Sequence, residues 1–139
     1  MRQVPWGLMS RGEEACRVVI CDDQSGFRQL VAIVLNLDPD LEVVGETADG
    51  RQAIQLVRKL RPDVLLLDIA MPVMDGLEAL PQIRESAPET QVVMLTGVVS
   101  DGVRQRALDA GACLFLEKGI GVETLVAEIK AVCRDASPV

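Results

Sequence analysis

Five polar residues follow short apolar runs of the sequence, and their types suit phosphoryl chemistry. They are Asp22, Asp23, Asp68, Thr96 and Lys118. Carboxylates that lie within a few Å of one another repel unless a cation neutralises them, and Mg²⁺ is well suited to do so. A carboxylate oxygen can attack phosphorus, while an ammonium group, a hydroxyl and the metal stabilise the charge on the phosphoryl oxygens. These residue types therefore predict a metal-dependent phosphoryl acceptor.

A magnesium site would take its ligands from the same residues. We expect Asp23 and Asp68 to bind Mg²⁺ (or Mn²⁺) directly and Asp22 to act through a bound water. The backbone carbonyl of Ala70, just past Asp68, would complete the ligands from the protein. The remaining positions would go to water and to a phosphoryl oxygen.

Apolar runs with β-branched residues alternate with longer segments of helical spacing. The runs are RVVIC (17–21), LEVVG (41–45), VLLL (64–67), QVVML (91–95) and CLFL (113–116). Apolar residues at i, i+3, i+4 and i+7 recur at 27, 30, 31 and 34, at 53, 56, 57 and 60, and at 122, 125, 126 and 129. The alternation predicts five strands and five helices.

This alternation favours a parallel sheet that is covered on both faces. Right-handed crossovers then lead to an α/β fold, a (βα)5 doubly wound three-layer sandwich of the flavodoxin-like kind with strand order 2-1-3-4-5. Parallel strands all end at one edge of the sheet, so the five polar side chains are expected to meet there. Ligands of such folds bind at that edge, where the strand order reverses.

Several residues have the types that begin and end helices. Ser25, Asp49 and Asp101 are expected to cap the first, second and fourth helices with their side chains. Asp75 is expected to cap the third helix, so we give it no catalytic role. Gly111 is expected to end the fourth helix with a positive φ.

The composition limits the classes of function. The net charge is −7 and the pI about 4.6, which argues against a general nucleic-acid surface. The longest apolar runs are far shorter than the roughly 20 residues of a membrane span. We therefore expect a cytoplasmic protein that binds neither nucleic acid nor a membrane directly.

The four cysteines carry no zinc signature. No C-x-x-C pair and no histidine is present, which argues against a zinc site. Cys21 and Cys113 lie in apolar runs and are expected to be buried. All four cysteines are expected to be reduced thiols, as is usual in the cytoplasm.

Four segments resemble those of bacterial response-regulator receiver domains, which are CheY-like. They are ICDDQ (20–24), LLLDIAMPVMDG (65–76), MLTG (94–97) and GACLFLEKG (111–119), in the order of that family. The resemblance spans residues 16–134. Its details are most similar to receivers that carry a C-terminal helix-turn-helix domain.

The resemblance implies a role for each polar residue. Asp68 would accept a phosphoryl group from the phosphohistidine of a sensor histidine kinase or a phosphotransfer protein. Asp22 and Asp23 would organise Mg²⁺, Lys118 would bind a phosphoryl oxygen, and Thr96 would move toward it. Such a protein is a signalling phosphoacceptor, not a turnover enzyme, and it loses the phosphoryl group slowly.

The sequence also departs from the family at informative positions. Phe115 occupies the aromatic switch position without a tyrosine hydroxyl, so it either switches by packing alone or is a plain buried aromatic. Gly119 follows Lys118 where many receivers have proline, which predicts a trans peptide and a more mobile loop. Ala70 and Val98 offer no polar group to orient water, which predicts a long-lived phosphoprotein.

We expect residues 1–15 to be a flexible N-terminal extension, residues 16–135 the receiver domain and residues 136–139 a C-terminal tail. Translation could begin at Met1 or Met9. The chain is either a stand-alone receiver or part of a longer DNA-binding regulator. The face formed by the fourth helix, the fifth strand and the fifth helix, residues 101–133, would contact a partner protein or output domain, or form a phosphorylation-dependent homodimer.

Three other functions fit parts of the pattern. A haloacid-dehalogenase-type phosphatase would need an aspartate where Ala70 stands, and a flavin mononucleotide binder would not place two acids after the first strand. A pseudo-receiver, which acts as an interaction module without phosphorylation, is the stronger alternative. Because the chain has no histidine, any phosphohistidine donor must act in trans.

Overall fold

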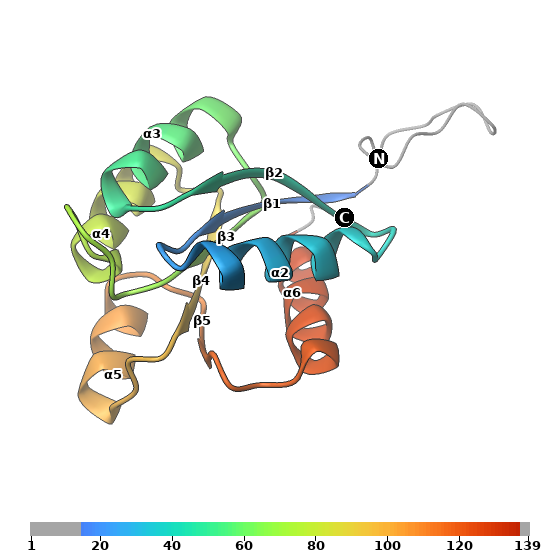
Figure 1. Cartoon of the computed structure of the whole chain (residues 1–139). Coiled ribbons are helices and arrows are strands. Elements are labelled where there is room, and N and C mark those ends of the chain that lie inside the picture. The colour runs from blue at the N-terminus through green and yellow to red at the C-terminus, as the bar shows by residue number, and fades with distance from the viewer. Residues whose placement is uncertain (1–14, 137–139) are drawn as a thin grey trace.

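The computed structural model describes residues 15–136, in which strands and helices alternate along the chain (Figure 1). They are β1 (Cys16–Cys21), α2 (Ser25–Asn36), β2 (Leu41–Thr47), α3 (Gly50–Leu60), β3 (Val64–Leu67), α4 (Gly76–Ser86), β4 (Gln91–Thr96), α5 (Asp101–Asp109), β5 (Leu114–Glu117) and α6 (Val122–Ala136). The strands form one parallel sheet in the order β2-β1-β3-β4-β5. The predicted fold class and strand order are confirmed.

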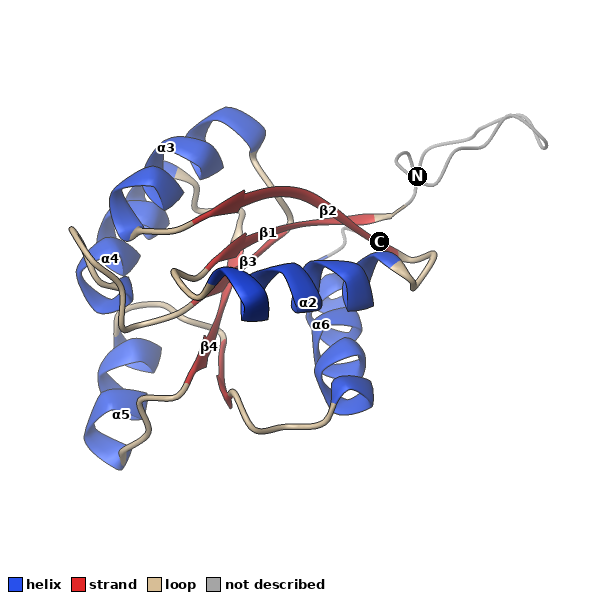
Figure 2. Ribbon diagram, viewed as in Figure 1, coloured by secondary structure: helices blue, strands red, loops and turns tan. Residues whose placement is uncertain are grey.

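Helices cover both faces of the sheet (Figure 2). The helices α2 and α6 pack on one face, and α3, α4 and α5 pack on the other. The face that was predicted to contact a partner, residues 101–133, corresponds to α5, β5 and α6.

The pleat of each strand divides its side chains between two cores. In β3, Leu65 and Leu67 pack toward α3, α4 and α5, whereas Val64 and Leu66 pack toward α2 and α6. All four side chains are at most 1 % exposed. This burial on both faces explains why every position of β3 is apolar. It also gives the next residue, Asp68, a rigid support.

Three of the predicted helix boundaries are confirmed. The Asp49 carboxylate accepts a hydrogen bond from the backbone N–H of Gln52 at 2.9 Å and begins α3. The Asp75 carboxylate accepts one from the N–H of Glu78 at 2.8 Å, and the Glu78 side chain accepts one in return, so α4 begins with a capping box. Gly111 has a φ of 111° just after α5.

Two predicted caps are wrong by one residue. Ser25 is already helical, and Gln24 is the cap residue of α2, without a side-chain bond to the helix. The Asp22 side chain accepts a hydrogen bond from the N–H of Gln24 at 2.9 Å, which turns the chain into the helix one residue early. Asp101 is the first residue of α5, and the hydroxyl of Ser100 is its cap. Where two neighbouring residues could each cap a helix, residue type alone does not show which of them is the cap.

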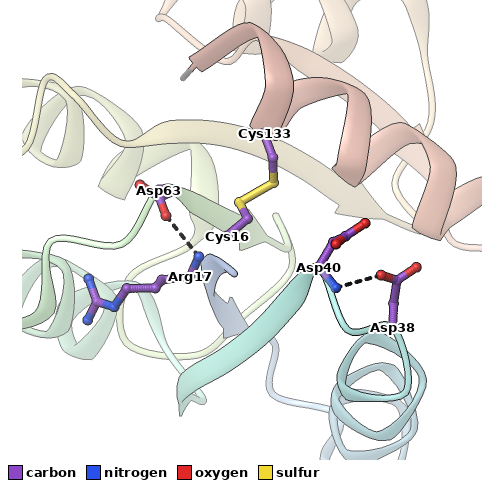
Figure 3. Close-up of a disulfide and its surroundings, with 6 residues drawn as sticks. All are labelled: Cys16, Arg17, Asp38, Asp40, Asp63 and Cys133. Atoms are coloured by element: carbon purple, nitrogen blue, oxygen red, sulfur yellow. Dashed lines mark hydrogen bonds between the residues drawn. A yellow bond between two sulfur atoms is a disulfide. The ribbon is translucent and has the colours of Figure 1, made fainter. Parts of the chain in front are cut away.

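The expectation of four reduced cysteines is wrong. Cys16 and Cys133 form a disulfide across 117 residues of sequence (Figure 3). The fold brings the start of β1 next to the end of α6, a proximity that spacing along the chain does not reveal. Cys21 is buried as predicted, but Cys113 is exposed because β5 begins only at Leu114.

A second link joins α6 to the same end of the sheet. The Lys130 ammonium lies 3.1 Å from a carboxylate oxygen of Asp38 and 3.0 Å from one of Asp40. Both aspartates lie in the turn between α2 and β2, near the disulfide (Figure 3). This end carries the first residues of β1 and β2, so it lies opposite the polar edge.

Within residues 15–136, no peptide bond is cis, which confirms the trans peptide predicted between Lys118 and Gly119. None of the described helices is long and apolar enough to cross a lipid bilayer. Apart from Ala15 and Ala136, the predicted extension and tail lie outside the described residues.

Candidate functional site

Two neighbouring strands deliver the buried carboxylates of the site. Asp22 follows β1 and Asp68 follows β3, and these strands pair with Cys21 opposite Leu67. The N–H of Asp68 donates a hydrogen bond to the carbonyl of Cys21 at 3.0 Å, which extends the pairing by one residue. Asp22 is 2 % exposed and Asp68 is 3 % exposed. The rigid strands therefore fix both carboxylates at the edge of the sheet.

Asp23 completes a cluster of three acids. One carboxylate oxygen from each of Asp22, Asp23 and Asp68 lies within 4.8 Å of the others. Asp23 is exposed, unlike its two neighbours. Like charges this close destabilise the fold unless cations balance them.

Lys118 supplies a positive charge to this cluster. Its ammonium lies 2.8 Å from Asp22 Oδ2 and 3.0 Å from Asp68 Oδ2. Its backbone N–H donates to the carbonyl of Thr96 at 3.0 Å, just beyond the paired part of β5. The structure thus brings together Asp22, Asp23, Asp68 and Lys118, as the sequence predicts.

The surroundings of the site shift the pKa values of Asp22 and Lys118. Burial raises the pKa of the Asp22 carboxyl, and the hydrogen bond from Lys118 offsets this only in part. Burial lowers the pKa of Lys118, but its hydrogen bonds to Asp22 and Asp68 outweigh burial and raise this pKa overall. Lys118 therefore stays cationic across the neutral pH range.

The two buried carboxylates are already bonded on both oxygens. Asp22 accepts from the N–H of Gln24 and from Lys118, and Asp68 accepts from the N–H of Ile69 at 2.8 Å and from Lys118. In contrast, no donor among residues 15–136 bonds the carboxylate of Asp23. Its oxygens are thus available to a ligand from solution.

A surface cavity of about 320 Å³ opens beside the acids. Its lining residues are Asp23, Gln24, Asp68, Ala70, Gly97, Val98 and Lys118. The cavity thus lies next to the predicted nucleophile, the predicted cation ligands and the predicted ammonium group.

Thr96 and Phe115 are buried, like Asp22 and Asp68. Thr96, the last residue of β4, is fully buried, and its hydroxyl accepts a hydrogen bond from the N–H of Val98 at 3.1 Å. Phe115 in β5 is 5 % exposed, and the guanidinium of Arg104 from α5 lies 5.0 Å from its ring centre. Thr96 does not line the cavity in this arrangement.

Two residues near Lys118 were missed by sequence reasoning. The side-chain oxygen of Gln24 accepts a hydrogen bond from the Lys118 ammonium at 2.8 Å. The ring of Phe27 lies with its centre 4.7 Å from the same ammonium. The helical spacing predicts only that Phe27 lies on the apolar face of its helix. The available signal was its position on the first turn of that helix, at the edge where the acids meet.

The chain matches the response regulator receiver domain family over residues 18–130. The protein-glutamate methylesterase/protein-glutamine glutaminase 2 of Photobacterium profundum is 44 % identical over 104 residues, which are 73 % of this chain and 26 % of that protein. The chain spans about a quarter of the length of the first such relatives it matches.

Solved receivers have the same fold. The signal receiver domain of the response regulator NarL from Mycobacterium tuberculosis has a TM-score of 0.82 and 34 % identity over 87 % of this chain and 98 % of that chain. The response regulator domain of Thermotoga maritima CheB has a TM-score of 0.78 and 32 % identity over 89 % of this chain and 99 % of that chain. By fold, sequence and family match, the chain belongs to the response regulator receiver domain family.

Proposed function

We propose that the chain is a phosphoacceptor response regulator whose Asp68 takes a phosphoryl group from a phosphohistidine on a sensor histidine kinase or phosphotransfer protein. The observation that carries this proposal is the setting of the Asp68 carboxylate. It is held by a buried strand, lies 3.0 Å from the Lys118 ammonium and shares its cluster with two more acids. Membership of the receiver family supports the same reading.

The transfer requires placement and charge from the protein. A carboxylate oxygen of Asp68 forms a bond to phosphorus while the bond between phosphorus and the donor imidazole nitrogen breaks, and the imidazole leaves with the electron pair. Lys118 is close enough to Asp68 to bind an oxygen of the arriving group. No general base is needed, because an ionised carboxylate is already a nucleophile.

The residues fit Mg²⁺ (or Mn²⁺). Asp23 offers an exposed carboxylate without a donor among the described residues, and Asp22 and Asp68 stand within 4.8 Å of it. Ala70 lines the same cavity, so its carbonyl is the fourth candidate ligand. When bound, the ion would neutralise charge on the carboxylates and on the phosphoryl oxygens.

The proposal includes a long-lived phosphoprotein. Ala70 and Val98 line the cavity beside Asp68 and carry no polar side chain that could orient an attacking water. Decay of the phosphoryl label after removal of the donor tests this part, and a lifetime of seconds would count against it.

The conformational change caused by phosphorylation would be transmitted to the face formed by α5, β5 and α6. Thr96 ends β4, which pairs with β5, and Phe115 of β5 lies under Arg104 of α5. Movement at Thr96 would thus reach this face through two adjacent strands, shifting a two-state equilibrium. We propose that a partner protein or an output domain in the cytoplasm reads the shift, with a phosphorylation-dependent homodimer as the other use of the face.

Phos-tag electrophoresis with acetyl phosphate and Mg²⁺ tests this function. The wild type and Asp101→Asn, a matched change on an exposed residue of α5, should both give a retarded band, and Asp68→Asn should not. Absence of the band in the wild type, even with a cognate kinase, would favour the pseudo-receiver.

A further inference from the structure

The segment that carries Lys118 is a short loop with two glycines. It runs from Lys118 to Gly121 between β5 and α6. A Cβ atom added at Gly119 or Gly121 would meet nothing within 4 Å. The backbone is tied by the bond from Lys118 to Thr96, by one from the N–H of Ile120 to Glu117 at 3.2 Å and by one from the N–H of Leu125 to the carbonyl of Gly121 at 3.0 Å. The side chain of Ile120 packs against the core between α2, α6 and the sheet. These anchors hold the backbone, whereas the place of the ammonium, at the end of a long side chain, also depends on the contacts that it makes itself.

Those contacts come from two sources. The ammonium donates hydrogen bonds to Asp68 (3.0 Å) and Gln24 (2.8 Å) and forms an ion pair with Asp22 (2.8 Å). The Phe27 ring adds a cation–π contact at 4.7 Å, within the roughly 6 Å over which such a contact is attractive. Gln24 is the cap residue of α2, and Phe27 lies on its first turn.

The proposed function would change the contacts of Lys118 with the acids, but not its contacts with the start of α2. Asp68 is the group that would be phosphorylated, and a cation at the cluster would compete with Lys118 for Asp22. Gln24 lines the same cavity as Asp68, but neither its amide nor the ring of Phe27 is a carboxylate that would be phosphorylated or would bind the cation. The contacts with Gln24 and Phe27 can therefore hold the Lys118 ammonium both before and after Asp68 is phosphorylated or a cation binds.

We propose that Gln24 and Phe27 are positioning residues, which keep the Lys118 ammonium at the proposed acceptor site. This inference rests on the proposed function of Asp68. Phe27 is itself anchored, because it is partly buried against the core between α2, α6 and the sheet. The first turn of α2 also bonds Asp22 through the N–H of Gln24, so one element sets an acid and the lysine together.

Conservative variants separate this role from plain packing. Phe27→Leu keeps an apolar side chain but removes the ring face, whereas Phe27→Tyr keeps the ring. With saturating Mg²⁺ and acetyl phosphate, we expect Phe27→Leu to be phosphorylated about 3- to 10-fold more slowly, as expected for the loss of one cation–π contact. Phe27→Tyr should retain the wild-type rate. The matched control is Leu30→Ala, which alters an exposed residue of the same helix.

A spectroscopic readout reports the contact itself. In ¹³C-lysine-labelled protein, the ring current of Phe27 should shift the ε-methylene resonance of Lys118 upfield. The shift should be lost in Phe27→Leu and kept in Phe27→Tyr. Gln24→Ala changes an exposed side chain, so it tests the same role even if a Phe27 variant fails to fold, and it should slow phosphorylation about 2- to 5-fold.

The failures of the two proposals can be told apart. If wild type and Asp68→Asn are labelled equally, the proposed function fails, while the Lys118 resonance still tests the contact. If the wild type is labelled on Asp68 but Phe27→Leu and Gln24→Ala match its rate, the positioning role is overturned. An equal loss of rate in Phe27→Tyr and Phe27→Leu would also overturn it, because it would reveal a packing requirement.

Discussion

At the scale of single residues, the three aspartates of the site have different environments although their side chains are the same. Asp22 and Asp68 are buried and bonded on both oxygens, whereas Asp23, one position along, is exposed. The sequence predicted which acids meet, because parallel strands end at one edge. It did not predict the contacts of Gln24 and Phe27 with Lys118, because these depend on the direction of side chains across a loop.

The cysteines give a prediction at the same scale. Under native, non-reducing conditions, an alkylating reagent should modify Cys113 alone, because Cys113 is exposed and Cys16 and Cys133 are paired. Cys21 should resist, since it is 1 % exposed and burial raises the pKa of its thiol to about 12. Peptide mass spectrometry after labelling checks this, with unfolded and reduced protein as the control. Native labelling of Cys16 or Cys133 would contradict the account.

At the scale of elements, the alternation of apolar runs and helical segments was sufficient to predict the sheet, its order and the helices. The errors fell at the ends of elements. Ser100 caps α5 in place of Asp101, and β5 starts one residue late, at Leu114. Both errors have one physical origin, since neighbouring residues of similar propensity compete and tertiary packing decides between them.

The start of α4 provides a sharp test, because Gly76 lies against the backbone of Asp68, the proposed acceptor residue. A Cβ atom at Gly76 would overlap the carbonyl oxygen of Asp68, and the N–H of Gly76 donates to the carbonyl of Ile69 at 2.9 Å. Gly76→Ala should lower the free energy of unfolding by about 2 to 4 kcal/mol and slow phosphorylation.

The matched control for this prediction is Gly26→Ala in α2, where an added Cβ would meet nothing within 4 Å. Alanine is the better helix former, so this variant should be unchanged or more stable by up to about 1 kcal/mol. Denaturant unfolding of both variants provides the measurement. Equal stability of Gly76→Ala and wild type would show that the backbone is not packed as described.

At the scale of the whole molecule, the two ends of the sheet have opposite characters. The amino ends of β1 and β2 are tied to α6 by the disulfide and by Lys130 with its two aspartates. The carboxyl ends carry the acids, the cavity and the loop from Lys118 to Gly121. The sequence predicts the cluster at the carboxyl ends, because its residues directly follow strands. It does not predict the link at the amino ends, because Cys16 and Cys133 come together only after folding.

The disulfide predicts a redox-dependent stability. It closes a loop of 117 residues, and in the chain-entropy view a loop of this size contributes about 4 to 5 kcal/mol. A strong dithiol reductant should therefore lower the thermal midpoint of the wild type, because the unfolded chain gains freedom. In Cys133→Ser, which has no such loop to open, the reductant should have no effect. An identical midpoint for the wild type with and without reductant would count against the link.

The central claim is that Asp68 receives the phosphoryl group. The most direct measurement is borohydride trapping of the acyl phosphate after incubation with acetyl phosphate and Mg²⁺, followed by peptide mass spectrometry. We expect the reduced side chain at position 68 and at no other aspartate. Trapping at Asp22 or Asp23, or no trapping in protein that a cognate kinase has treated, would contradict it.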